Sequence, residues 1–159
     1  MIDWLSARIQ NEGSPALDTF LEQTAAEHMT RATRTVTRDV TLRELENLFE
    51  KDDFNAYPVE EHSQVVGLVS KFDFLACFVF SPAAMVPRYG DLMKRTVANI
   101  MTPDFIYVRG ETRLTRVLQL MVDHRIRSMP VIEGDHRLVG MISREDVMRA
   151  LQRCSGVAQ

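Results

Sequence analysis

The feature that most constrains this chain is an internal repeat. Residues of the same type stand 72 positions apart in its first part and 73 positions apart after one turn. A register that survives with a single-residue change at a turn indicates two copies of one structural unit. The matching pairs include Met29-Thr30 with Met101-Thr102, Val36 with Val108, Pro58-Val59 with Pro130-Val131, Ser70 with Ser143, and Asp73 with Asp146.

Within each copy, the hydrophobic pattern changes from a helical period to short strands. In the second copy, residues 105–108 are extended, and residues from about 112 to 124 form an amphipathic helix. Two apolar strands follow at 128–132 and 138–142, separated by the turn-forming Glu133-Gly134-Asp135, and a last helix follows Ser143. Each copy has only about 55 residues, too few to bury a stable core alone, so we expect the two copies to share one.

The repeat divides the chain into five segments. Residues 1–24 form an N-terminal helical arm, in which Leu17, Phe20 and Leu21 lie on one helical face that we expect to pack against the body. Residues 25–80 form the first copy and residues 97–151 the second. Residues 81–96 form an ordered linker, because the segment lacks the Ser/Gly-rich composition of a flexible tether. Residues 152–159 are a tail.

Composition limits the class of protein. The chain has 159 residues, of which 45% are hydrophobic and 26% charged, as in soluble globular proteins. Its net charge of -3 argues against a general nucleic-acid binder. Cys77 and Cys154 are too few for a disulfide framework, which favours a reducing compartment. The most apolar run, residues 74–80, is far shorter than the roughly 20 residues of a membrane span. No signal peptide is recognisable, so we expect a cytoplasmic protein with no membrane partner.

Taken together, the motifs resemble the tandem CBS-domain pair, or Bateman module. The resemblance rests on motifs of the second copy and on looser versions in the first, and it covers residues of about 25 to 151. The motifs of the second copy are Ile100-Met101-Thr102-Pro103, Arg127-Ser128-Met129-Pro130-Val131 and Gly140-Met141-Ile142-Ser143-Arg144-Glu145-Asp146. Those of the first are His28-Met29-Thr30, Asn55-Ala56-Tyr57-Pro58-Val59 and Gly67-Leu68-Val69-Ser70-Lys71-Phe72-Asp73.

The resemblance implies an α/β (α+β) fold and a regulatory role. Each CBS repeat would be a small β-sheet with flanking helices, and the two would pack as a pseudo-twofold disc. Such pairs bind adenosine-containing ligands in the clefts between repeats, commonly form homodimers and are not enzymes. The only bound molecule that we expect is therefore an adenine nucleotide as regulatory ligand.

The resemblance also implies site residues. Asp146 and Asp73 would contact the ribose hydroxyls, and Ser143 and Ser70 would lie near the phosphate. The residues expected around the adenine are Ile100, Met101, Thr102, Met129, Pro130 and Val131. A second interpretation of the Ser-x-x-Asp motif stays open, because the same pattern forms a capping box at a helix N-terminus.

The two copies differ in charge next to their motifs. The second copy has His124, Arg125, Arg127 and Arg144 around its motif, whereas the aligned positions of the first copy hold Asp52, Asp53, Asn55 and Lys71. Carboxylates repel a polyphosphate, so this difference predicts that the Asp146 site binds the phosphate of a nucleotide. The Asp73 site would then be degenerate or take a less negative ligand. Arginines at a helix end also complement the helix dipole, and this alternative fits Arg125 well.

The sequence therefore predicts a stand-alone CBS pair that senses AMP, ADP, ATP or a similar ligand and signals to a regulated partner protein. The alternative function is a ligand-free structural module for dimerisation or docking. The four histidines are scattered and have no cysteine partners, so no metal site is expected. No Walker A, GxSxG or GxGxxG motif is present.

Overall fold

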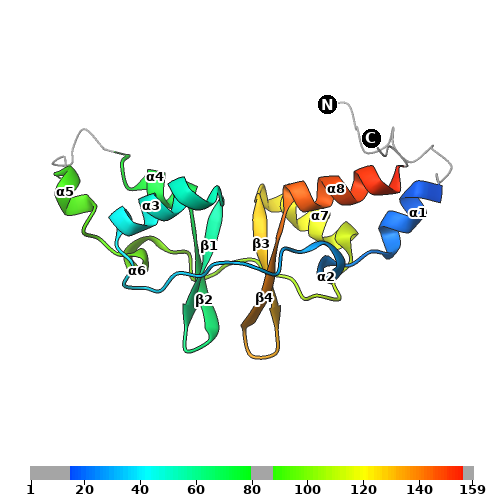
Figure 1. Ribbon diagram of the computed structural model, residues 1–159, viewed down its shortest axis with the longest axis horizontal. Coiled ribbons are helices and arrows are strands. Elements are labelled where there is room, and N and C mark those ends of the chain that lie inside the picture. The colour runs from blue at the N-terminus through cyan, green and yellow to red at the C-terminus, as the bar shows by residue number, and fades with distance from the viewer. Residues whose placement is uncertain (1–14, 80–87, 156–159) are drawn as a thin grey trace.

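Two antiparallel hairpins lie side by side at the centre of the molecule (Figure 1). The first is formed by β1 (Ala56–Glu61) and β2 (Gln64–Ser70), and the second by β3 (Ser128–Glu133) and β4 (Arg137–Ser143). The structure is a computed structural model that describes residues 15–79 and 88–155. The predictions for residues 1–14 of the arm, for the linker before residue 88 and for the tail from residue 156 lie outside the described residues.

Helices flank each hairpin on its outer side, so the molecule has two similar halves (Figure 1). α3 (Leu42–Asp52) and α4 (Lys71–Ala76) belong to the first half, and α7 (Leu114–His124) and α8 (Arg144–Cys154) to the second. The shorter helices are α1 (Pro15–Glu22), α2 (Ala25–His28), α5 (Tyr89–Leu92) and α6 (Val97–Ile100). This mixed α/β architecture, with one small sheet and flanking helices in each half, confirms the predicted fold class.

Local signals in the sequence set the limits of α3. Its first turn is closed by a capping box, in which the Thr41 backbone N–H donates to Glu44 Oε2 at 2.8 Å and the Glu44 N–H donates to Thr41 Oγ1 at 3.2 Å. The helix ends at Asp53, whose φ of 50° lies in the left-handed region. α7 ends in the same way at Arg125, where φ is 54°. These two helix ends, 72 residues apart, matter for the site described below.

The hairpin turns account for the change of repeat spacing from 72 to 73. The first hairpin turns through two residues, His62 and Ser63, both with positive φ, as in the tight turns favoured between antiparallel strands. The second turns through three residues, Gly134 to His136. The predicted turn and the two predicted hairpin strands of the second copy are thus confirmed, with strand ends shifted by one residue. The strand predicted at residues 105–108 is not formed, and Val108 makes only an isolated bridge with Val131.

The first residues of each sequence copy leave their own half of the molecule and pack against the hairpin of the other copy. The backbones of Thr30 and Met141 exchange two hydrogen bonds, of 2.8 and 2.9 Å, at the edge of β4. Thr102 and Leu68 exchange the equivalent pair, of 2.8 and 3.0 Å, at the edge of β2. α2 therefore lies in the second half and α6 in the first (Figure 1). Each half is built from both copies.

α1 and the part of the linker that contains α5 take part in the same exchange. The Leu114 N–H donates to the Gln23 carbonyl at 2.9 Å, and the Leu42 N–H donates to the Arg95 carbonyl at 2.8 Å. Both the donors and the acceptors are 72 residues apart. The described part of the arm and the described part of the linker are therefore equivalent in the repeat, a relation that the sequence motifs did not indicate.

Only one of the three apolar arm residues packs as predicted. Phe20 is 3% exposed and belongs to the hydrophobic core of the second half, in contact with residues of α7 and α8. Leu17 and Leu21 are 51% and 45% exposed, so the prediction that they pack on the body is wrong. A helix of eight residues presents a single narrow face to its neighbours, and here Phe20 occupies it.

The described residues form two hydrophobic cores, one in each half, and not the single shared core that the sequence predicts. The first core contains Val36, Leu42, Leu45, Phe49, Tyr57, Val59, Val69, Met93 and Val97. The second contains Phe20, Ala25, Val108, Leu114, Val117, Met121, Met129, Val131, Ile142, Val147 and Ala150. Each core includes residues from both copies, so neither copy completes a core by itself. No helix among the described residues has the length and apolar character needed to cross a membrane.

Candidate functional site

A cavity of about 160 Å³ lies between the two halves. It combines the second copy's Ser-x-x-Asp motif and neighbouring strand residues with a longer set of residues from the first copy. The second copy contributes Ser128, Met141, Ser143 and Asp146. The first copy contributes Thr30, Thr33, Arg34, Asp53, Phe54, Asn55, Ala56 and Pro58.

Asp146 is the most unusual residue of this cavity, because its side chain is charged and only 3% exposed. Its Oδ2 atom accepts hydrogen bonds from the Ser143 N–H at 2.8 Å and from Ser143 Oγ at 2.9 Å. The Asp146 N–H donates to Ser143 Oγ at 3.3 Å. The capping-box interpretation of the motif is therefore confirmed. Capping uses only Oδ2, so it does not exclude a ligand.

The second carboxylate oxygen of Asp146 also has a partner within the protein. Arg149 Nη2, one turn further along α8, donates to Asp146 Oδ1. The Arg149 side chain itself is 60% exposed. Asp146 is thus a buried carboxylate with both oxygens hydrogen-bonded, as a buried charge requires.

Among the described residues, Arg34 is the single basic residue in the lining of this cavity. Its Nη1 atom lies 2.9 Å from Asp52 Oδ2, and Asp52 also accepts a hydrogen bond of 2.9 Å from the Tyr57 hydroxyl. Burial and the Asp52 carboxylate raise the pKa of Tyr57 well above its usual range, so this hydroxyl stays a donor. The network holds the Arg34 guanidinium at the cavity and satisfies part of its charge.

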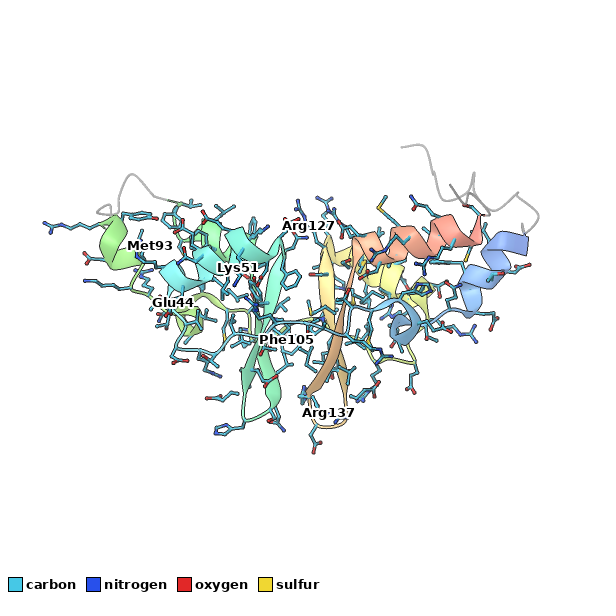
Figure 2. All side chains as sticks on the ribbon, in the orientation of Figure 1. Glu44, Lys51, Met93, Phe105, Arg127 and Arg137 are labelled. Carbon is cyan, nitrogen blue, oxygen red and sulfur yellow. The ribbon has the colours of Figure 1, made fainter. Side chains whose placement is uncertain are left out.

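Arg125, Arg127 and Arg144 do not line this cavity. The residues that face the Asp146 motif are instead Asp53 and Asn55, the first-copy counterparts of Arg125 and Arg127. These arginines therefore contribute no charge to the lining of this cavity, and their contact with a phosphate stays a prediction. The reason is geometric: the end of α3, before the first hairpin, lines the same cavity as the Ser-x-x-Asp motif of the second copy. In Figure 2, Arg127 lies where the two halves face each other.

None of the six residues predicted around the adenine lines the cavity. Met129 and Val131 have no exposed surface, and both belong to the second core. Pro130 is buried between them. Ile100 and Met101 pack against the first core, and Thr102 pairs with Leu68 in the first half.

The apolar lining of the cavity comes mainly from the first copy. It consists of Phe54, Ala56, Pro58 and Met141. Sequence analysis missed these residues, although Pro58 and Thr30 stand 72 positions before the predicted Pro130 and Thr102. The repeat thus related the lining residues to the predicted ones. The lining could be identified only from the structure, which shows that segments are exchanged between the halves.

The motif of the first copy has the same capping geometry. Asp73 Oδ2 accepts from the Ser70 N–H at 2.8 Å and from Ser70 Oγ at 2.7 Å. Asp73 is more exposed than Asp146, and none of the described residues donates to its Oδ1. Position 76, which corresponds to Arg149, is an alanine.

Potential metal ligands are dispersed over the described part of the chain. Within residues 15–79 and 88–155, no three His, Cys, Asp or Glu side chains come together in a way that could hold a metal ion.

A family model of known proteins matches this chain twice, once in each copy of the repeat. Residues 25–79 and 97–153, most of the chain, match the family model described as CBS domain. The chain is 28% identical over 167 residues to the CBS domain-containing protein CBSX1, chloroplastic, of Arabidopsis thaliana, covering 91% of this chain and 70% of that protein. The chain spans 43%, 70% and 52% of the length of three curated relatives.

Solved structures show the same fold. The structure resembles CBSX2 of Arabidopsis thaliana in complex with AMP, with a TM-score of 0.70, 24% identity and coverage of 83% of this chain and 98% of that one. It also resembles the CBS domain pair of protein MJ0100 in complex with 5'-methylthioadenosine and S-adenosyl-L-methionine. The TM-score is 0.66, with 21% identity and coverage of 80% of this chain and 94% of that one. At these identities the similarity establishes the fold alone.

Proposed function

Because this chain belongs to the CBS domain family, with two such domains in tandem, we propose that it is a regulatory module for an adenosine-containing ligand. The ligand binds in the cavity between the two halves, and binding is passed on to a partner protein. The observation that carries the proposal is the cavity itself, which brings Asp146 of one half against residues of the other. The AMP, methylthioadenosine and S-adenosylmethionine complexes of proteins with this fold support the ligand class.

Each part of the cavity has a role in this proposal. The Asp146 carboxylate accepts hydrogen bonds from the ribose hydroxyls, which are charge-assisted and therefore strong. Phe54, Pro58 and Met141 contact the apolar faces of the adenine. Ser143 stands at the N-terminus of the eleven-residue helix α8, where free N–H groups favour an anion.

The charges around the cavity favour a ligand with few negative charges. The lining holds two carboxylates, Asp53 and Asp146, and one guanidinium, that of Arg34. Each has an ion-pair partner outside the lining: Lys71 for Asp53, Arg149 for Asp146 and Asp52 for Arg34. Each further phosphate adds repulsion from Asp53. We therefore expect adenosine, AMP and S-adenosylmethionine to bind this cavity better than ADP or ATP.

We propose that Ser70, Asp73, Thr102, Arg125 and Arg127 belong to the opposite side of the repeat pair. Ser70 and Asp73 would face the α7 end, with Arg125 and Arg127, just as Ser143 and Asp146 face Asp53 and Asn55. Thr102 pairs with Leu68 there as Thr30 pairs with Met141 beside the cavity. We propose this side as a second site, in which the two arginines favour a ligand that carries phosphate.

A ligand screen tests the proposed function. The full chain is titrated by calorimetry and followed by thermal unfolding with adenosine, AMP, ADP, ATP, NAD and S-adenosylmethionine, and guanosine serves as the control. A ligand at 100 times its Kd should stabilise the fold by about 2.7 kcal/mol, because it binds the folded state alone. Stabilisation by at least one adenosine compound and not by guanosine is the expected result. No binding of any compound at millimolar concentration would contradict the proposal.

A dimerisation module is the second candidate function, and one observation favours it. Phe72 and Leu75 lie in α4 and Val79 lies three residues after its end, and these side chains are 78%, 62% and 81% exposed. An apolar groove of about 230 Å³ lies beside this face, between α3 and α4, lined in part by Phe49 and Phe74. Contiguous exposed apolar surface is typical of an interaction site. We propose that a second copy of the chain covers this face.

Phe72→Asp is expected to convert the dimer to a monomer, because a buried unpaired carboxylate is costly at an interface. Light scattering coupled to size-exclusion chromatography measures the change. Leu17→Asp is the matched control, since Leu17 is also exposed but lies in α1, at the far end of the molecule (Figure 1). A dimer that survives Phe72→Asp, or a wild type that is monomeric at tens of micromolar, would exclude this interface.

A further inference from the structure

The two Ser-x-x-Asp motifs differ in one contact that neither capping nor the cavity requires. Asp146 Oδ1 accepts a hydrogen bond from Arg149, and its Oδ2 is used by Ser143. The carboxylate lines the cavity, yet it is 3% exposed and has no free oxygen. In the first copy, the residue at the position of Arg149 is Ala76, and none of the described residues donates to Asp73 Oδ1.

We propose that Arg149 is a specificity-determining residue that closes the Asp146 site from within. This inference rests on the proposed function, in which the Asp146 carboxylate accepts the ribose hydroxyls. A ribose hydroxyl that donates to Oδ1 competes for this oxygen with the Arg149 guanidinium, which must turn away to leave it to the ligand. Arg149 can do so because its side chain is 60% exposed and Asp146 is the one ion-pair partner that the described residues give it.

Competition between Arg149 and the ligand has a consequence for ligand choice. A neutral nucleoside must break the ion pair and leaves the guanidinium without a partner other than water. An adenosine ligand that carries an anionic group offers the released guanidinium a new counter-charge. Arg149 therefore favours the binding of nucleotides over nucleosides. The carboxylates of Asp53 and Asp146 have the opposite effect, because they repel a phosphate.

If the Arg149–Asp146 ion pair only stabilised the helix, its removal would have a different effect. Acid and base side chains three residues apart commonly support a helix, and their loss changes stability and not ligand affinity. A competing ion pair, in contrast, makes the affinity for a neutral ligand depend on salt. Salt weakens the Arg149–Asp146 pair in part, through the guanidinium, since the Arg149 side chain is 60% exposed and Asp146 is buried, and adenosine itself carries no charge to be screened. The affinity of the wild type for adenosine should therefore rise with ionic strength.

The test measures adenosine and AMP binding to the full chain by calorimetry, at low and high salt. Arg149→Ala should bind adenosine about twofold to fivefold more tightly than the wild type, which corresponds to losing one partly exposed ion pair. The salt dependence of adenosine binding should disappear, and the preference for AMP over adenosine should fall. Arg149→Lys, which keeps the charge, and Arg153→Ala, which removes an exposed arginine one turn further along α8, should behave like the wild type.

The outcomes separate this inference from the proposed function. If adenosine binds the wild type and Arg149→Ala with equal affinity and equal salt dependence, Arg149 does not close the site, and the proposed function stands. If adenosine binds to Arg149→Ala but binds to the wild type only weakly or not at all, closure of the site by Arg149 is supported. If no adenosine compound binds either protein, the proposed function fails, and this inference fails with it.

Discussion

Asp146→Asn is expected to weaken adenosine binding at least tenfold. The substitution keeps the size of the side chain and leaves one amide oxygen for the Ser143 N–H, so the helix cap survives. It removes the negative charge that makes the bonds to ribose hydroxyls strong, and hydrogen bonds to a charged group are worth about 1.5–3 kcal/mol each. One such bond corresponds to about a tenfold or larger change in Kd. Isothermal calorimetry with adenosine measures the effect.

Asp73→Asn provides the matched control for this prediction. Asp73 has the same capping contacts with Ser70 as Asp146 has with Ser143, but it does not line the cavity. Adenosine binding in the cavity should therefore be unchanged in Asp73→Asn. Loss of binding in Asp73→Asn together with intact binding in Asp146→Asn would show that the cavity beside Asp146 is not the site. Thermal unfolding of both variants verifies that each is folded.

Gly140→Ala is expected to destabilise the protein by about 1–3 kcal/mol, the usual cost of forcing an extra carbon into a well-packed region. A Cβ atom at Gly140 would lie 2.7 Å from Met29 Sδ and 2.9 Å from the Thr30 carbonyl oxygen. The thioether can move, but the Thr30 carbonyl is fixed by its hydrogen bond with Met141. The substitution therefore acts on the segment that crosses from the first copy to the second half. Chemical denaturation measures the loss.

Alanine substitutions at two other glycines serve as comparisons for Gly140→Ala. At Gly67, the equivalent position, a Cβ atom would lie 3.0 Å from Met101 Sδ and 3.2 Å from the Thr102 carbonyl oxygen, so Gly67→Ala should cost less. A Cβ atom at Gly90, in α5, would meet no described atom within 4 Å, and alanine there should be neutral or stabilise by up to about 1 kcal/mol. A Gly140→Ala variant as stable as Gly90→Ala would show that the crossing segment packs less closely than in this structure.

The exchange of segments suggests how a ligand could affect the whole molecule. The cavity contains Thr30 and Met141, whose paired backbones join the first copy to the second half, and Asn55, which follows α3. A ligand that contacts all of them restrains both halves at once. It can shift the arrangement of the halves only to the extent that it binds one arrangement more tightly than another.

Much of this architecture could be predicted from the sequence, because it depends on interactions between near neighbours in the chain. The capping box of Ser143 and Asp146 joins residues three apart, and the turn between β3 and β4 is defined by residues adjacent in sequence. The apolar period of α7 follows from its own geometry, since Leu114, Val117 and Met121 fall on one face. The 72-residue spacing then related one copy to the other.

The partners across the cavity were decided only by the tertiary structure. Repeat spacing shows that Arg127 and Asn55 are equivalent, but equivalence does not say which motif each of them faces. That choice depends on backbone hydrogen bonds between segments far apart in sequence, such as those of Thr30 with Met141, which leave no periodic trace. These hydrogen bonds attach the first residues of one copy to the hairpin of the other copy. The repeat therefore identified the kind of site, and the crossing placed Asp53 and Asn55, and not the arginines, opposite Asp146.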